Sequence, residues 1–136
     1  MMKKELTADD IFELSRAFHN MATVVGQYRY DHWDEFTKSQ RSDLENKQWT
    51  LFNTASDLNA ETVLIKIKFI EKDLQVLKSA TTAMLSTAKK IKNIKHAIRI
   101  AAKAVAFGGS IYAAASTGNV VVIISTALEL IEEIST

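Results

Sequence analysis

The chain contains no cysteine and no proline, and it has only four glycines in 136 residues. Without cysteine there are no disulfides, no thiol nucleophile and no cysteine-ligated metal site. Without proline, no residue in the sequence forces a helix to stop, so long helices are permitted almost everywhere. The hydrophobic share of 47% is ordinary for a globular protein, and this length suits a single domain, residues 1–136.

Apolar residues recur in alternating steps of three and four along most of the chain. This spacing is typical of helices that pack on one another. We expect four helices, at about residues 8–40, 43–57, 60–107 and 111–135. Thr7 is suited to cap the first of them, because Asp9 and Asp10 follow in the first turn, where a helix favours negative charge.

The predicted helix boundaries come from caps and glycines. Ser42 with Glu45 forms a possible capping box, so a break is expected near residues 37–42. A tight turn at Leu58-Asn59 separates the second helix from the third. Gly108-Gly109 should end the third helix, which would be roughly 70 Å long if straight, and Gly118-Asn119 is a second candidate interruption.

These elements predict an all-α fold. Residues 7–57 and 60–107 are similar in length and would form a long antiparallel helical hairpin. The last helix would pack on this hairpin, completing a three- or four-helix bundle.

Residues suited to catalysis are few. The densest polar cluster, residues 31–35, lacks the Glu-x-x-His motif of helical di-metal sites. Gly108-Gly109 precedes Ser110, but no strand comes before it and no Gly-Lys-Ser follows, so a phosphate-binding loop is not predicted. We therefore expect a protein that is not an enzyme and that has no metal or cofactor.

Six of the eleven aromatic residues fall between residues 28 and 52. Aromatic side chains serve either the core of a bundle or an interface with a partner, where Trp and Tyr are enriched. If this cluster faces a partner, the candidate binding residues are Tyr28, Trp33, Phe36 and Trp49.

Charge is distributed unevenly. Residues 1–73 hold 13 acidic and 10 basic side chains, whereas residues 74–136 hold three acidic and seven basic ones. No acidic residue lies between Asp73 and Glu129. This acid-free stretch includes an amphipathic segment whose basic residues share one helix face and are candidates to meet a membrane or another anion: Lys89, Lys92, Lys95, Arg99 and Lys103. No nucleic-acid-binding motif accompanies them and the pI is near neutral, so nucleic acid is not an expected partner.

Residues 104–128 form a run of 25 positions with no charged side chain, which is long enough to cross a bilayer. One interpretation is a central helix buried on all sides. The other is a hairpin that inserts into an anionic membrane beside the basic residues. Ser116, Thr117 and Asn119 weaken the second interpretation, because they are polar and lie in the middle of the run.

In plan, the chain resembles the α-helical pore-forming toxins of bacteria, which combine very long helices with one shielded, uncharged, glycine-containing hairpin. That resemblance implies a membrane-active protein and assigns no functional residue. The heptad pattern favours a different function, binding to a second copy or to a helical protein partner. We expect a cytoplasmic protein with or without membrane association, because Asp9 and Asp10 stand where a secretory signal needs apolar residues.

Overall fold

The computed structural model describes residues 3–60 and 67–136, and this part of the chain confirms the all-α class. Its five α-helices are α1 (Ala8–Asp31), α2 (Lys38–Ala60), α3 (Glu71–Leu85), α4 (Ile94–Thr117) and α5 (Val121–Ser135). Two 3-10 helices, η1 (Trp33–Glu35) and η3 (Thr87–Lys89), lie in the connections. Two short strands, β1 (Lys3–Glu5) and β2 (Lys68–Ile70), pair antiparallel with Lys4 opposite Phe69.

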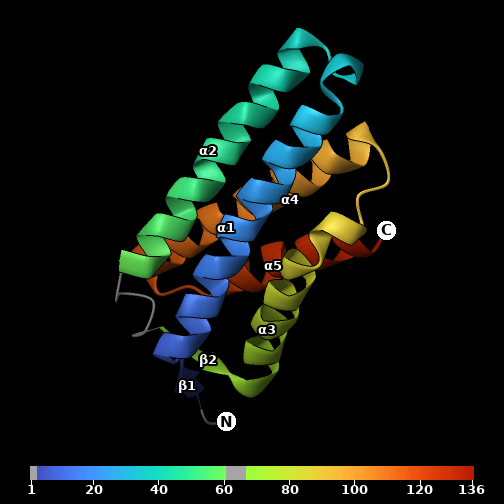
Figure 1. Ribbon diagram of the computed structural model, residues 1–136. Helices are drawn as coiled ribbons and strands as arrows, with labels where there is room; N and C mark the ends of the chain where they lie inside the picture. Colours follow the sequence, from blue (N-terminus) through green and yellow to red (C-terminus); the bar gives the residue numbers. More distant parts are fainter. Residues whose placement is uncertain (1–2, 61–66) are drawn as a thin grey trace.

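The long antiparallel hairpin of this fold is formed by α1 and α2, which pack together along their length (Figure 1). Thr7 caps α1 as predicted. Its hydroxyl accepts the Asp10 N–H at 3.0 Å and the Asp10 carboxylate accepts the Thr7 N–H at 3.1 Å. The apolar seam of the predicted first helix follows steps of three and four. Its residues Ile11, Leu14, Phe18, Met21 and Val25 are buried in the core, and the last, Tyr28, is half-buried.

The predicted first helix, residues 8–40, is too long. α1 ends at Asp31, and α2 begins after Thr37, whose hydroxyl accepts the Gln40 N–H while the Gln40 side chain accepts the Thr37 N–H. The capping box therefore lies five residues before the predicted Ser42. A break in this region is confirmed, but the predicted boundary was wrong. Thr37 with Gln40 and Ser42 with Glu45 both have the spacing of a capping box, so the sequence did not distinguish them.

α1 lies at the centre of the bundle, in contact with α2, α3 and α4. In Figure 1, α4 crosses behind the α1–α2 hairpin, and α5 returns alongside α4 and packs against α3. The core is centred on Phe18 of α1 and Phe107 of α4, whose fully buried rings stack with centroids 5.5 Å apart. Phe18 lies on the predicted apolar seam of α1.

The predicted helix over residues 60–107 is wrong in the described residues. Residues 61–66 of this predicted helix lie outside the described residues. The predicted turn at Leu58-Asn59 is also wrong, because α2 continues through both residues to Ala60. Beyond Ile67 the chain forms β2, α3, η3 and then α4. The heptad steps continue unbroken through the residues that connect α3 to α4, so the spacing gave no sign of the break.

Side-chain hydrogen bonds accompany the break at the end of α3 and at the start of α4. The Ser86 hydroxyl donates to the Thr82 carbonyl at 2.7 Å, and the Thr87 hydroxyl donates to the Ala83 carbonyl at 3.2 Å. Hydroxyl and amide side chains of this kind compete with regular helix bonding. Asn93 then caps α4 by accepting the His96 N–H at 2.8 Å, and the new helix buries a different face from the one that the seam predicted.

Gly108-Gly109 was predicted to end a helix but lies inside α4. Gly108 instead allows close packing, because a Cβ there would lie 3.1 Å from Thr54 Cγ2 and 3.3 Å from Phe18 Cε1. The helix ends at Gly118, which has the positive φ of 76° that glycine adopts readily. The predicted interruption at Gly118-Asn119 is thus confirmed, and the predicted helix 111–135 is split between α4 and α5.

The two adjacent glycines give a matched pair of substitutions. Gly109→Ala should raise the free energy of unfolding by about 0.5–1 kcal/mol, because alanine favours the helix and no atom lies within 4 Å of the added Cβ. Gly108→Ala should lower it by about 1 kcal/mol through overpacking. Urea unfolding measures both, and equal stability of the two variants would contradict the close contact at Gly108.

Candidate interaction surfaces

The structure divides the four aromatic residues proposed to bind a partner. Phe36 is 3% exposed and belongs to the core, and Tyr28 is half-buried against it. Trp33 and Trp49 are 46% and 60% exposed. Only the two tryptophans are therefore available to a partner in this fold.

Trp33 lies in the connection between α1 and α2, where the guanidinium groups of two arginines lie close to its ring. The guanidinium of Arg41 lies 4.7 Å from the ring centroid and that of Arg29 lies 5.6 Å away. The Arg41 Nη1 also donates to the carbonyl oxygens of Trp33 and Phe36, both at 2.8 Å. This ring already contributes to holding the connection together through cation–π contacts.

Trp49 belongs to an aromatic strip on the outer side of the α1–α2 hairpin. Its ring lies 6.1 Å from that of Phe52, which in turn meets the His19 ring edge-to-face at 5.3 Å. Phe12, exposed on α1, lines a depression along the same two helices together with His19. Sequence reasoning missed Phe12, because it lies outside the aromatic cluster of residues 28–52.

The five candidate basic residues also separate into two groups. Arg99 lies 3.2 Å from the Glu133 carboxylate and Lys103 lies 3.7 Å from that of Glu129, both across to α5. Lys89, Lys92 and Lys95 are exposed and take part in none of the ion pairs between described residues. Of the five candidates, the three outside these ion pairs therefore lie in η3, in the connection after it and in the first turn of α4, and folding places acidic residues beside the other two.

The uncharged run 104–128 forms the second half of α4, the turn after it and the first half of α5. It is buried on one side only. Its inner side includes Phe107, Ile111 and Ile123, which are in the core. The interpretation of a segment buried on all sides is therefore wrong.

We call the outer side of these two helices the hairpin face. On α4 it presents a row of exposed small residues at helical steps of four, three and four: Ala102, Ala106, Gly109 and Ala113. On α5 it presents three exposed large apolar residues, Val121 (69% exposed), Val122 and Leu128. No charged residue of the run interrupts this surface, because residues 104–128 contain none.

The two helices of the hairpin face are joined near their tip by hydroxyl groups. The Ser110 hydroxyl lies 2.6 Å from the Phe107 carbonyl and 2.8 Å from the Thr126 hydroxyl. On the side toward α2, the Tyr112 hydroxyl donates a short hydrogen bond to Asp57. Partial burial raises the pKa of Tyr112 most, and the hydrogen bond to Asp57 raises it further. The phenol therefore stays protonated and remains a donor.

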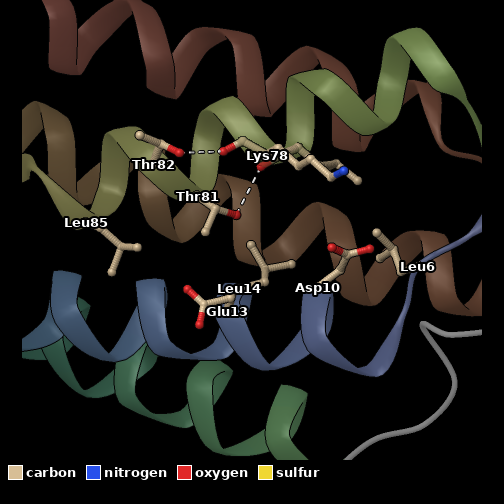
Figure 2. A pocket seen from close by; sticks show the side chains of 9 residues that line it. Leu6, Asp10, Glu13, Leu14, Lys78, Thr81, Thr82 and Leu85 are labelled. Atoms are coloured by element: carbon tan, nitrogen blue, oxygen red, sulfur yellow. Dashed lines mark hydrogen bonds between the residues drawn. The ribbon is translucent and has the colours of Figure 1, made fainter.

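A shallow groove lies between the start of α1 and α3 (Figure 2). Leu14 and Leu85 from the two helices contribute to its apolar lining. The rim hydroxyls of Thr81 and Thr82 are already hydrogen-bonded to carbonyls of their own helix. Asp10, also on the rim, is occupied by the cap of α1. The lining also includes Lys78 and Glu13, whose carboxylate pairs with Arg16 at 2.9 Å, so the groove combines apolar surface with a charged rim.

Within residues 3–60 and 67–136, no three acidic or histidine side chains lie close enough together to hold a metal ion. The cluster at residues 31–35 is mostly exposed at the end of α1 and in η1, where the His32 ring stacks on Tyr28 at 4.0 Å. No protein-family model, curated protein or solved structure matches the chain.

Two neighbouring alanines near the tip of α4 test which side of the uncharged run is buried. Ala114→Arg should lower the free energy of unfolding by about 3–5 kcal/mol, because it places a charge in the core. Ala115→Arg should change it by less than about 0.5 kcal/mol, because Ala115 is exposed. Circular dichroism during urea titration distinguishes them, and an unfolded Ala115→Arg variant would contradict this burial.

Proposed function

We propose that this protein is a non-enzymatic helical-bundle protein that acts by self-association, binding a second copy of itself on the hairpin face. The observation that carries the proposal is the composition of that face. Charged residues are depleted at the centres of protein interfaces, and the hairpin face is uncharged over the whole of residues 104–128. It is also exposed rather than folded into the chain's own core.

The row of small residues on α4 suits the close approach of another helix. Interaxial distance between packed helices depends on the side chains at the contact, and here these are Ala102, Ala106, Gly109 and Ala113. At Gly109 a Cβ would meet no atom within 4 Å, so this glycine serves no packing contact within the chain. Val121 and Val122, exposed at the start of α5, would add apolar area to the contact if the second copy also covers that helix.

The position of Lys95 favours an antiparallel, two-fold pairing of α4 with its copy. Closed two-fold dimers use the same patch on both copies. If α4 pairs antiparallel with its copy, centred between Ala106 and Gly109, the two Lys95 side chains lie roughly 35 Å apart at 1.5 Å per residue. A parallel pairing would place the same lysines side by side, where like charges repel.

Self-association can be tested by analytical ultracentrifugation over a concentration series. The wild type is expected to form a dimer, and Ala106→Arg and Ala113→Arg should each raise its Kd at least tenfold, since each buries an unpaired charge in the contact. Ser79→Arg, at an exposed position of α3, is the matched control and should leave the Kd unchanged.

A wild type that remains monomeric up to about 1 mM, a concentration at which even a weak dimer of millimolar Kd is populated, would exclude a second copy as the occupant. The same face would then be available to a helix of a different protein. If the Ser79 variant weakened the dimer as much as the Ala106 variant, the contact would not lie on the hairpin face.

A second candidate function is membrane binding through the same segment. Among the described helices, α4 is long and apolar enough by length and composition to cross a membrane, although half of its most apolar window is buried in the fold. Lys89, Lys92 and Lys95 lie at the opposite end of α4 from the hairpin tip, so a membrane touching the tip alone would not meet them.

Flotation with vesicles containing phosphatidylserine, combined with dye release, tests this candidate. A membrane-active protein should float with these vesicles and release dye, and Val121→Asp together with Val122→Asp should abolish both effects, because charge is costly in the bilayer. Absence of binding and of release by the wild type would dismiss membrane activity and leave self-association as the function to be tested.

A further inference from the structure

The groove between α1 and α3 is lined by charges of opposite sign that do not pair with each other. Asp10 and Glu13 line it from α1, and Lys78 lines it from α3 (Figure 2). Lys78 takes part in none of the ion pairs between described residues. Glu71, a further acid near Lys78, already pairs with Lys4 at 3.4 Å. A molecule that carries both a positive and a negative group would complement both sides of the groove.

The floor of the groove is apolar. Leu14 and Leu77 are each 4% exposed, and Leu6 and half-buried Leu85 lie at its two ends (Figure 2). The groove has a volume of about 230 Å³, which is below the roughly 300–1,000 Å³ of sites for drug-sized ligands. It therefore suits a small molecule with a short apolar side chain.

Thr81 leaves room above this floor. It is half-buried and lines the groove, and its hydroxyl donates to the Leu77 carbonyl at 3.0 Å. A longer apolar residue at this position would reach further into the groove and pack on the leucines. The sequence therefore leaves open a space that a leucine side chain could occupy.

We propose that this groove binds a free apolar α-amino acid. The side chain of the amino acid packs on Leu14 and Leu77. Its carboxylate contacts the ammonium group of Lys78, and its ammonium group contacts the carboxylates of Asp10 and Glu13. The two charges of an α-amino acid lie directly beside its side chain, as the charged rim lies directly beside the apolar floor.

The rim also selects against ligands that carry one charge. A simple carboxylate would satisfy Lys78 but would approach the two acids, and a simple amine would satisfy the acids but would approach Lys78. Like charges that are brought close together repel. The zwitterion is therefore the favoured occupant among small molecules with the same apolar side chain.

Both acids of the rim retain an oxygen for the ligand. In the described part of the chain, the Glu13 carboxylate is bound through Oε2 alone, by Arg16 at 2.9 Å. The Asp10 carboxylate is bound through Oδ2 alone, by the Thr7 N–H at 3.1 Å. The pair of Glu13 with Arg16 lies at the surface, where ion pairs contribute little, so it does not prevent Glu13 from contacting a ligand.

This site is separate from the proposed self-association. The hairpin face belongs to α4 and α5, whereas every residue of the groove lies on α1, on α3 or at Leu6. Either proposal can therefore fail while the other holds.

The test is an NMR titration of the full chain, labelled at its leucine methyl groups, with free leucine and two analogues. The analogue 4-methylpentanoate lacks the ammonium group, and 3-methylbutylamine lacks the carboxylate. The methyl signals of Leu14 and Leu77 should shift saturably with free leucine, with a Kd on the order of 1 mM for so small a ligand. Each analogue should bind about two- to fivefold more weakly, as for the loss of one exposed ion pair.

Variants of the rim assign each charge of the ligand to its partner. Lys78→Met should weaken binding of leucine and of 4-methylpentanoate about two- to fivefold without weakening that of 3-methylbutylamine. Glu13→Gln should weaken binding of leucine and of 3-methylbutylamine without weakening that of 4-methylpentanoate. Lys72→Met removes another exposed lysine of α3, outside the groove, and is the matched control that should change no affinity.

Thr81→Leu should fill the groove, abolish binding of all three molecules and raise the urea concentration at the unfolding midpoint. The proposal would be overturned by the absence of a saturable shift up to about 50 mM leucine, far above the expected Kd. Equal affinity for leucine and both analogues would overturn it as well. So would retained binding by Thr81→Leu, or a Lys72→Met variant that weakens leucine binding as much as Lys78→Met does.

Discussion

The break between α3 and α4 is the constraint on which the rest of the structure depends. An unbroken helix from residue 71 to residue 117 would be roughly 70 Å long and would extend far beyond α1 and α2, which have 24 and 23 residues. α3 ends with Ser86 as its C-cap, η3 follows, and the side chain of Asn93 caps the first turn of α4. The interruption lets α4 fold back across α1 and α2 and lets α5 fill the space between α3 and α4. His96, four residues beyond Lys92, then secures the new direction of the chain to the end of α5.

The sequence predicted caps and apolar seams within one helix more reliably than the points at which one helix ends and the next begins. The cap at Thr7 and the seam of α1 were both predicted, because each depends on residues within one or two turns. The break at residues 86–93 was missed because the three–four spacing of apolar residues runs through it without a change. Gly108 was misassigned because a glycine that ends a helix and a glycine that admits a neighbouring helix look the same in sequence. Only the distance to Thr54 and Phe18 separates the two roles.

The candidate surfaces also depend on contacts that local sequence patterns do not predict. A run without charges was predictable from residues 104–128, but which of its side chains face outward depends on the phase of α4, which resets at Asn93. Acidic residues at the end of α5 lie about 30 positions from Arg99 in sequence, so their pairing could not be read from the local pattern. The basic stripe that composition predicts is consequently shortened in the fold to the residues before and at the start of α4.

The hairpin face also distinguishes the two proposed functions by their energetic cost. Insertion of α5 into a bilayer requires that Ile123, Leu130 and Ile134 leave the core, where each is almost fully buried. Lipid tails are as apolar as the core, so these side chains lose little by the transfer itself. The core that they leave loses their packing, at about 2–5 kcal/mol for each side chain, which is roughly 6–15 kcal/mol in all. That range is comparable to the total stability of a typical domain, about 5–15 kcal/mol, so insertion would have to accompany extensive unfolding. Self-association uses only the side of the hairpin that is already exposed and leaves the core intact. The proposed self-association therefore needs no change in the native fold, whereas insertion of α5 into a bilayer requires a rearranged state.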